Sequence, residues 1–298
     1  MIKFLRVTKG FGRMTAVRDL SFDIGSGGIC GLLGRNGAGK TTSINMALGL
    51  VFADRGEIEI MGHPIPSKLN QALVHVGAAL EKPAFYPFLT GRENLCLLAK
   101  MRGPGSFCNA DKALEMVGLA SRGRDRYRTY SRGMKRRLGL AAALMPDVQL
   151  IILDEPQEGL DPAGIAELRT LLVHEAEGSG KTIFISSHRL SEVERICDRV
   201  IIIDQGALLI QGQLADLLGP GPELIRIETR HVDQAREMLT RQGCWIAPWG
   251  TGETNLWFSR PACTASQALL AAPGVGEQVH PRSLETLFLA LTGSSISL

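Results

Sequence analysis

The nine residues GRNGAGKTT, from Gly34 to Thr42, constrain the fold of this chain more than any other segment. They match the pattern G-x-x-x-x-G-K-[ST], whose glycines let successive backbone N–H groups point at one anion. An apolar run, Ile29–Leu33, precedes the pattern and suits a buried strand, and the SINMALGL that follows suits a helix. Because the helix N-terminus adds the positive end of its dipole, this order predicts a phosphate-binding loop in an α/β fold.

Each position of the loop has an expected role. Lys40 is expected to reach the β- and γ-phosphates of a nucleotide, and the Thr41 hydroxyl is expected to ligate Mg²⁺. The other residues expected to contact the nucleotide are Gly34, Asn36, Gly37, Ala38, Gly39 and Thr42. A chance glycine-rich turn is the alternative, and the motifs further along the chain argue against it.

The composition fits a protein with a sizeable core and excludes several classes of protein. Hydrophobic residues make up 45% of the 298 residues, and the net charge of +3 is too small to argue for a nucleic-acid partner. No apolar run approaches the ~18 residues of a membrane span, and the N-terminus has no apolar signal-peptide region. The six cysteines form no C-x-x-C pair, which favours reduced thiols over a disulfide framework or a zinc site.

From Leu150 onward, strand-like runs alternate with helix-like patterns, which predicts a parallel sheet. The runs expected to form strands are Ile2–Arg6, Leu20–Ile24, Glu57–Met61, Leu150–Leu153, Thr182–Ser186 and Val200–Ile203. A capping box, Thr90-Gly91-Arg92-Glu93, begins a helical stretch that extends to about Leu119. A helical insert, about residues 82–145, is therefore expected to interrupt the α/β core.

The segment Gly219-Pro220-Gly221-Pro222 predicts a domain boundary between residues 1–218 and 219–298. Beyond it the patterns predict a small β-α-β-β-α-β module. Its expected strands and helices are Glu223–Thr229, Val232–Arg241, Trp245–Ala247, Asn255–Ser259, Ala265–Ala272 and Gly276–His280. A last helix, Ser283–Thr292, carries one apolar face, which packs on its own protein or docks on a partner.

Two carboxylates end the apolar run LIILDEP, Leu150–Pro156. Asp154 is expected to hold Mg²⁺ through its water shell, opposite Thr41. Glu155 is expected to polarise a water that attacks the γ-phosphate. His188 follows another apolar run, IFISS, at the edge of the sheet where α/β ligand sites occur, and can hydrogen-bond a γ-phosphate.

The segment YSRGMKRRL, Tyr130–Leu138, places Ser131 and Gly133 at the start of a predicted helix. A serine there can cap the helix and can also donate to an anion. Many basic residues surround this segment, and they favour a solvated basic face over contact with anionic lipid headgroups. They are Arg122, Arg124, Arg126, Arg128, Arg132, Lys135, Arg136 and Arg137.

These motifs, in this order, resemble the nucleotide-binding subunits of ATP-binding cassette (ABC) transporters over about residues 1–215. The resemblance implies a P-loop ABC ATPase core with a helical subdomain, to which the last residues add a small α+β extension. It also implies roles for single residues. Phe11 stacks on adenine, and Ser131 and Gly133 contact the ATP held by the other subunit. Glu155 is the general base, Asp161 is the D-loop aspartate, and His188 is the switch histidine.

The chain departs from the family pattern at three positions. The signature reads YSRGM instead of LSGGQ, Glu158 stands where many members have Asn or Ser, and Glu81 replaces the Q-loop glutamine. A carboxylate at this last position adds negative charge beside a triphosphate. We therefore expect Glu81 to stay away from the phosphates, near a basic residue such as Lys82, until metal-bound ATP draws it in as a Mg²⁺ ligand.

A narrower resemblance rests on Glu81 with the following PAFYPFLTGREN and on the late segment SLETLFLALTG. Both are similar to the bacitracin- and lantibiotic-resistance type of exporter ATPase. This implies an ATP-hydrolysing subunit that uses ATP and Mg²⁺ and pairs head to tail with a second copy of itself. It also implies that the subunit works with a separate transmembrane permease at the cytoplasmic face of the membrane and exports a peptide antibiotic or drug. The alternatives are an importer, a transporter of lipid, polysaccharide or another small molecule, a soluble ABC ATPase, and a ligand-sensing C-terminal module.

Overall fold

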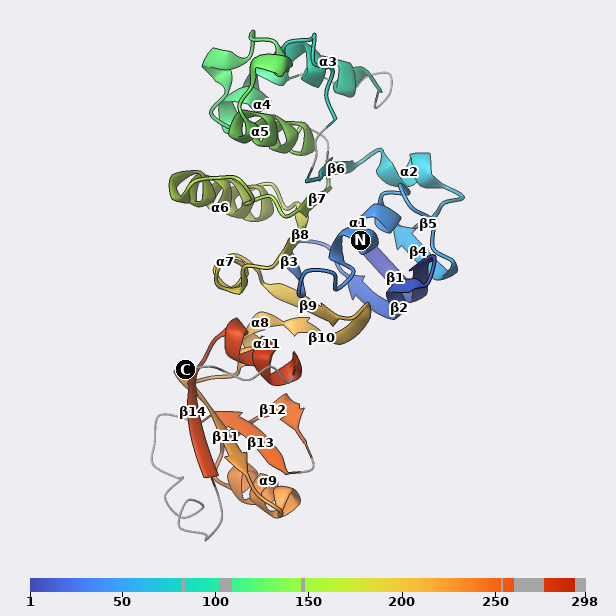
Figure 1. The fold of residues 1–298 in the computed structure, drawn as a ribbon. Helices are drawn as coiled ribbons and strands as arrows, with labels where there is room; N and C mark the ends of the chain where they lie inside the picture. The colour runs from blue at the N-terminus through green and yellow to red at the C-terminus, as the bar shows by residue number, and fades with distance from the viewer. Residues whose placement is uncertain (82–83, 102–108, 146–147, 253, 260–275, 293–298) are drawn as a thin grey trace. The chain divides into compact units, whose positions relative to one another are not determined.

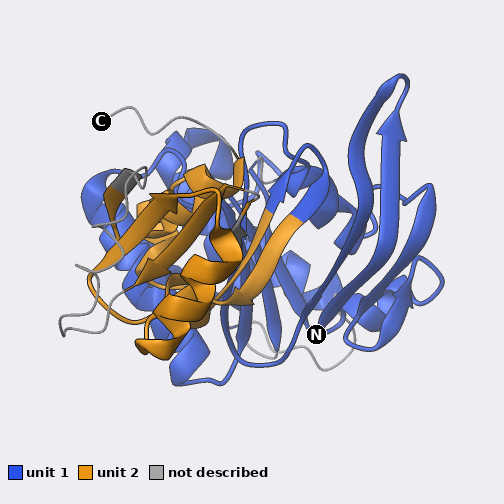
Figure 2. Ribbon diagram, turned by 90° about the horizontal axis from the view of Figure 1, so that it is seen from below, with its two compact units in different colours: residues 1–188, 203–208 blue, residues 189–202, 209–298 orange. Residues whose placement is uncertain are grey.

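The computed structural model describes residues 1–81, 84–101, 109–145, 148–252, 254–259 and 276–292 (Figure 1). The chain divides into two compact units, which Figure 2 colours separately. Unit 1 comprises residues 1–188 and 203–208, and unit 2 comprises residues 189–202 and 209–298. A division into domains at residues 218 and 219 remains a proposal.

Unit 1 begins with an antiparallel sheet whose strands alternate buried and exposed side chains. The strand order is β2-β1-β4-β5, and the bounds are β1 Ile2–Phe11, β2 Met14–Ile24, β4 Arg55–Ile60 and β5 His63–Ile65. Phe4 and Phe22 stack with ring centroids 4.5 Å apart on the buried face. The early strands expected from the sequence are confirmed, and β1 and β2 are longer than expected.

The second sheet of unit 1 is parallel and runs in the order β3-β8-β7-β6. Its strands are β3 Gly28–Leu33, β6 Val76–Ala79, β7 Leu150–Asp154 and β8 Thr182–Ser187. Every residue of β7 and β8 is buried, as expected for parallel strands that helices cover. The carboxyl ends of β3, β7 and β8 therefore meet at one edge, directly before Gly34, Glu155 and His188.

Helices α3, α4 and α5 contact one another and form the helical insert between β6 and β7 (Figure 1). They span α3 Gly91–Met101, α4 Ala110–Met116 and α5 Arg132–Ala143. The predicted capping box is confirmed, because the Thr90 N–H donates to Glu93 at 2.7 Å and the Glu93 N–H donates to Thr90 Oγ1 at 3.1 Å. Helix α5 approaches β6 so closely that a Cβ atom on Gly77 would collide with the carbonyl oxygen of Ala143.

The helices and strands not yet described belong to unit 1 or unit 2. They are α1 Lys40–Ala47, α2 Leu69–Leu73, two short 3₁₀ helices at Ala120–Arg122 and Tyr127–Thr129, α6 Pro162–Glu177, α7 Leu190–Glu194, β9 Arg199–Asp204, β10 Ala207–Gln213 and α8 Leu214–Leu218. Within the described residues, no helix combines the length and the apolar character needed to cross a bilayer.

The expectation that all thiols are reduced is wrong at one position. Cys96, on α3, is disulfide-bonded, whereas Cys30, Cys197 and Cys244 are free and buried. The absence of C-x-x-C pairs could not reveal this bond, because that pattern concerns only cysteines close together in the sequence. The other two cysteines, Cys108 and Cys263, lie outside the described residues.

The C-terminal part of unit 2 contains an antiparallel sheet in the order β12-β13-β11-β14. Its elements are β11 Glu223–Glu228, α9 Val232–Arg241, β12 Trp245–Thr251, β13 Asn255–Ser259, β14 Gly276–Pro281 and α11 Leu284–Thr292. They match the expected order, and the helix expected at Ala265–Ala272 lies outside the described residues. We call residues 223–292 the C-terminal module.

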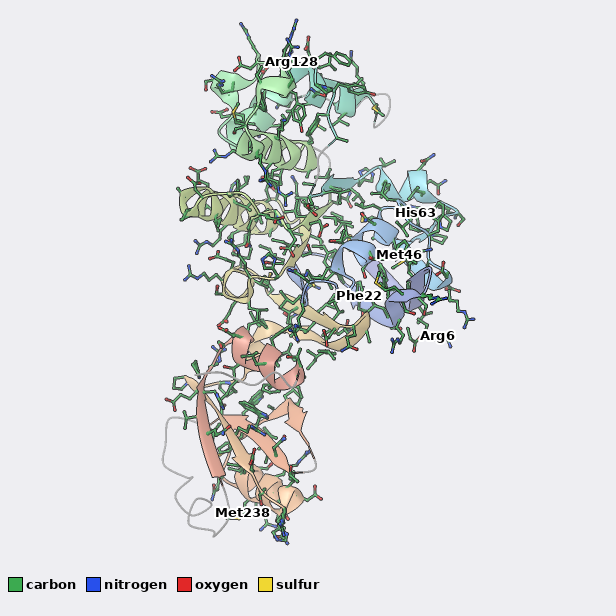
Figure 3. All side chains as sticks on the ribbon, viewed as in Figure 1. Arg6, Phe22, Met46, His63, Arg128 and Met238 are labelled. Atoms are coloured by element: carbon green, nitrogen blue, oxygen red, sulfur yellow. The ribbon has the colours of Figure 1, made fainter. Side chains whose placement is uncertain are left out.

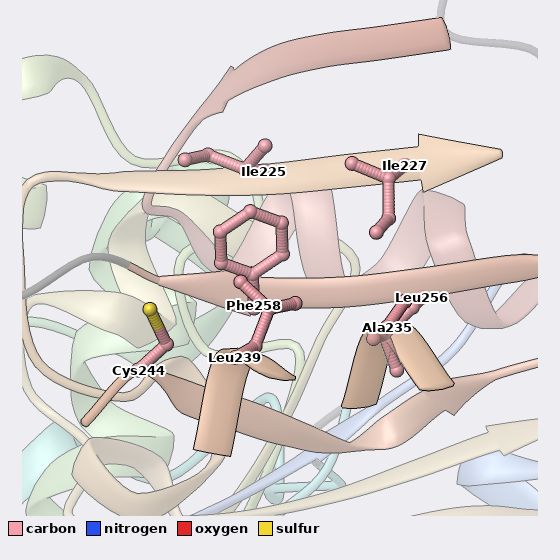
Figure 4. Packing of buried hydrophobic residues seen from close by; sticks show 7 residues of the cluster. All are labelled: Ile225, Ile227, Ala235, Leu239, Cys244, Leu256 and Phe258. Atoms are coloured by element: carbon pink, nitrogen blue, oxygen red, sulfur yellow. The ribbon is translucent and has the colours of Figure 1, made fainter. Parts of the chain in front are cut away.

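Both faces of the module's sheet carry buried apolar side chains. The cluster in Figure 4 packs α9 against one face through Ile225, Ile227, Ala235, Leu239, Cys244, Leu256 and Phe258. A second cluster contains Leu224, Ala247 and Trp257, with Ala290 of α11 packed against it. Helix α11 therefore packs on its own protein, and the Leu284 N–H also donates to Glu194 at 2.8 Å.

Replacing Leu239 by Ala is expected to destabilise the module by about 2–5 kcal/mol, because Leu239 is fully buried and its loss leaves a cavity. The matched control is Met238→Ala on the same helix, since Met238 (labelled in Figure 3) is 41% exposed and should change stability by only about 0.5 kcal/mol. All three tryptophans of the chain, Trp245, Trp249 and Trp257, lie in the module. Urea unfolding followed by tryptophan fluorescence would measure both variants, and equal midpoints would contradict the prediction.

Candidate functional site

The glycine-rich loop joins β3 to α1, as the sequence pattern predicts. Helix α1 begins at Lys40, and its N-cap, Gly39, has φ 102°. A Cβ atom at Gly39 would lie 2.6 Å from the Ala16 carbonyl oxygen, so only glycine fits this turn. The outer part of the loop is open to solvent, since Asn36 and Gly37 are exposed.

The first helical turn after the loop presents its polar groups in different ways. Thr41 is exposed and Thr42 half-buried, whereas Gly34 and Ala38 are buried. Lys40 is also buried, with 6% of its surface exposed. Its ammonium donates to the carbonyl oxygens of Gly34 at 2.8 Å and Arg35 at 3.3 Å.

A carboxylate, an ammonium and an imidazole converge where β3, β7 and β8 end. Glu155 Oε1 lies 3.5 Å from Lys40 Nζ, and Glu155 Oε2 lies 2.8 Å from His188 Nδ1. The three residues come from three separate segments of the chain, and the sequence analysis expected each of them to act at the γ-phosphate. Glu155 adopts the left-handed backbone conformation, with φ 47°, which is costly for a residue other than glycine.

Ser186 connects the two carboxylate-bearing residues, and the sequence analysis missed it. Its hydroxyl donates to Asp154 Oδ1 at 2.5 Å and accepts the Glu155 N–H at 3.0 Å. Asp154 and Ser186 are direct partners in the β7–β8 ladder, and both are buried. Only the strand pairing could have identified Ser186, because the register of β8 against β7 places it beside Asp154, the last residue of β7.

The solvated basic face expected around helix α5 is wrong at Arg136, which is only 7% exposed. The guanidinium donates to the carbonyl oxygens of Glu81 at 2.7 Å and Asp154 at 2.9 Å, and also to that of Glu155. Helical spacing could have revealed this, since Leu140 and Ala143, four and seven residues later, are buried on the same face.

Burial is the main effect on Arg136, and it lowers the pKa of the guanidinium from its ordinary value. Surrounding carboxylates oppose that shift: they belong to Glu158, Asp154, Glu81 and Glu155. Exposed side chains elsewhere in the basic run fit the expectation of a solvated face. Arg128, labelled in Figure 3, is one of them.

Helix α5 starts at the signature-like segment. The Ser131 hydroxyl accepts the Met134 N–H at 3.2 Å, so Ser131 caps the helix. Ser131 is exposed and Gly133 half-buried. The cap is confirmed, and contact with a nucleotide across a dimer remains a prediction.

Glu81 is exposed and lines a cavity of about 330 Å³. The other residues that line it are Tyr127, Arg132, Lys135, Arg136, Glu158 and Gly159. A basic environment for Glu81 was expected, and here Arg132, Lys135 and Arg136 form it. Lys82, the neighbour named from the sequence, lies outside the described residues.

Phe11 and Asp161 are both exposed. Phe11 lies at the tip of the β1–β2 hairpin, is 47% exposed, and has the Lys9 ammonium 5.4 Å from its ring centroid. Asp161 is exposed and caps α6, accepting the Gly164 N–H at 2.9 Å. Stacking on adenine and a D-loop function remain predictions.

Comparison with known proteins places the chain in one family. Residues 17–158 match the model of the ABC transporter family. The chain is 44% identical to the bacitracin transport ATP-binding protein BcrA of Enterococcus faecalis, over 73% of this chain and 70% of that protein. It is 35% identical to the linearmycin resistance ATP-binding protein LnrL of Bacillus subtilis strain 168, over 99% of each.

Solved structures share the fold. An ATP-binding subunit of an ABC transporter is 29% identical with a TM-score of 0.66, covering 73% of this chain and 91% of the other. A dimeric ATP-binding cassette in a post-hydrolysis state with ADP and phosphate has the same TM-score at 24% identity, covering 72% of this chain and 98% of the other. With the phosphate-binding loop and the paired Lys40 and Glu155 in place, these matches lead to one conclusion: the chain belongs to the ABC transporter family and is an ABC-cassette ATPase that binds and hydrolyses ATP.

Proposed function

We propose that this chain powers an ABC exporter that moves a peptide antibiotic or a drug out of the cell through a separate membrane subunit. The observation that carries the catalytic part is the convergence of Lys40, Glu155 and His188 on one edge of the parallel sheet. The names of the relatives, one for bacitracin transport and one for linearmycin resistance, support an antibiotic as cargo. The chain would act at the cytoplasmic face of the membrane.

The donor groups fit a magnesium ion that arrives with the nucleotide. Mg²⁺ in such sites binds one or two carboxylates together with substrate phosphates and water, and the described part of the chain has no group of three or more His, Cys, Asp or Glu residues that could hold a metal ion by themselves. The residues proposed to hold it are Asp154, the Thr41 hydroxyl and Glu81. When bound, the ion would neutralise charge that develops on the phosphates during hydrolysis.

The chain's own residues divide the remaining work. The backbone N–H groups from Gly34 to Thr42 bind the phosphates. The Lys40 ammonium leaves its ion pair with Glu155 and binds the β- and γ-phosphates. Glu155 then accepts the proton of the attacking water. His188 hydrogen-bonds the γ-phosphate, and Phe11 stacks on the adenine.

A second copy of the chain completes each site in this proposal. Ser131 and Gly133 of one copy would contact the ATP held by the other, and Asp161 would lie at the same interface. The exposure of Ser131 at the start of α5 supports this role, as does the dimeric state of one related cassette. Residues 219–298 would form an accessory domain that stabilises the chain or its dimer.

The proposal is tested by expressing the chain together with a candidate membrane permease in an antibiotic-sensitive host. The pair is expected to raise the minimal inhibitory concentration of bacitracin, and Glu155→Gln should abolish the increase because hydrolysis powers the export. An equal increase with Glu155→Gln would contradict ATP-driven efflux. Resistance to another antibiotic or drug would keep the proposal with a different cargo, whereas no resistance to any of them would favour the rival cargo classes, lipid, polysaccharide or another small molecule.

Recruitment to the membrane is a separate expected result of the same experiment. Expressed with its partner, the chain should remain in the membrane fraction after a high-salt wash and be released by detergent. Expressed alone, it should remain in the supernatant. Release by salt alone would instead indicate attachment through the exposed arginines near Arg128, because salt screens surface charge.

A further inference from the structure

Arg136 ties helix α5 to the ends of two strands of the parallel sheet. Its guanidinium donates to the Glu81 carbonyl after β6, and to the Asp154 and Glu155 carbonyls at the end of β7. Five residues earlier, Ser131 caps the same helix. One side chain thus connects the signature-like helix with the backbone of the proposed hydrolytic base.

Packing alone does not account for a buried guanidinium at this point. Burying a charge is unfavourable unless hydrogen bonds and nearby opposite charges compensate it, and an apolar side chain would fill the space without that cost. Leu140 and Ala143 do so on the same helical face. A guanidinium, however, carries several donors in a fixed plane and can bond carbonyls of two strands at once.

The backbone of Glu155 needs external support. Its left-handed conformation, φ 47°, is unfavourable for a glutamate and persists only where the surroundings enforce it. Ser186 accepts the N–H of Glu155, and Arg136 donates to its carbonyl oxygen. With both backbone groups held, the carboxylate points to His188 and Lys40.

We propose that Arg136 is a positioning residue for the hydrolytic base: it holds the backbone of Glu155 in its left-handed conformation and links the direction of that carboxylate to helix α5. A shift of α5, such as contact at Ser131 would produce, is thereby passed to the base of the same subunit. This inference rests on the proposed role of Glu155.

The experiment measures single-turnover hydrolysis by the full chain, in excess over radiolabelled Mg·ATP, beside ATP affinity and thermal unfolding. Arg136→Gln is expected to slow hydrolysis about a hundredfold, as small displacements of catalytic groups do, with unchanged ATP affinity. Arg136→Lys, which keeps the charge but cannot span both strand ends, should give an intermediate rate and serves where the glutamine variant does not fold.

The matched control is Arg137→Gln on the same helix. Arg137 is also partly buried, but it bonds the Val117 carbonyl at 3.4 Å and Glu167 at 3.3 Å instead of the strand ends. It should keep the wild-type rate even if it lowers stability. Equal losses of rate in the Arg136 and Arg137 variants would overturn the inference, because they would reflect general loosening of α5.

A double-mutant cycle separates positioning from an independent structural effect. If Arg136 acts through Glu155, the variant carrying both Arg136→Gln and Glu155→Gln should be as slow as Glu155→Gln alone. A further hundredfold loss in the double variant would overturn the inference. Wild-type hydrolysis by Glu155→Gln would instead refute the proposed base, whatever Arg136 does.

Discussion

Replacing Glu155 by Gln is expected to reduce ATP hydrolysis by about 10²–10⁴-fold, the usual contribution of a general base. Glutamine cannot accept the proton of the attacking water, yet the phosphate-binding loop and Lys40 are unchanged, so ATP still binds. Removing the carboxylate also removes a negative charge 3.5 Å from Lys40 Nζ. The variant should therefore accumulate as an ATP-bound dimer.

Phosphate release and size-exclusion chromatography with Mg·ATP measure the two outcomes. Glu167→Gln is the matched control, since this exposed glutamate on α6 pairs with Arg137 and lies outside the proposed site. It should turn over ATP at the wild-type rate and should not be trapped as a dimer. Wild-type turnover by Glu155→Gln would show that another group activates the water.

Replacing Ser131 by Arg is expected to abolish hydrolysis while the monomer still binds ATP. The bulky cation would occupy the helix start that is proposed to face the partner's nucleotide. Ser131→Ala is the milder comparison: it removes the hydroxyl that accepts the Met134 N–H, at a cost of about 1 kcal/mol in stability, and that is proposed to contact the partner's ATP, but it adds neither bulk nor charge. Its effect on hydrolysis should be far smaller.

Mixing two inactive proteins tests whether Ser131 acts across a dimer. In a mixed dimer of Ser131→Arg and Lys40→Ala, one composite site combines an intact phosphate-binding loop with an intact signature. Activity should therefore reappear on mixing, although neither variant hydrolyses ATP alone. No recovery would favour a role of Ser131 within its own chain, and loss of ATP binding by Ser131→Arg would reveal a folding defect.

The sequence predicted those parts of the site that depend on local pattern. The loop before Lys40 and the apolar strands before Asp154 and His188 carry their signals in consecutive residues, and the topology of a parallel sheet brings their ends together. The pattern also predicted the capping box at Thr90, since its two bonds join residues only three apart.

The parts that were missed depend on contacts between distant segments. Arg136 was counted with its charged neighbours; helical spacing indicates that it lies on the buried face of α5, but not that it reaches the carbonyl of Glu155. Ser186 is one of two serines that end an apolar run, and only its register against Asp154 distinguishes it.

Because Lys40 is already paired with Glu155, the phosphates of ATP must compete with the Glu155 carboxylate for the Lys40 ammonium. The lysine that should bind the phosphates neutralises the carboxylate that should activate water. Part of the binding free energy of ATP is then used to separate this pair, so the measured affinity understates the strength of the phosphate contacts. Separation of the pair frees the Glu155 carboxylate only when ATP binds. The negative charge that activates the water is therefore available only when the γ-phosphate to be hydrolysed is present.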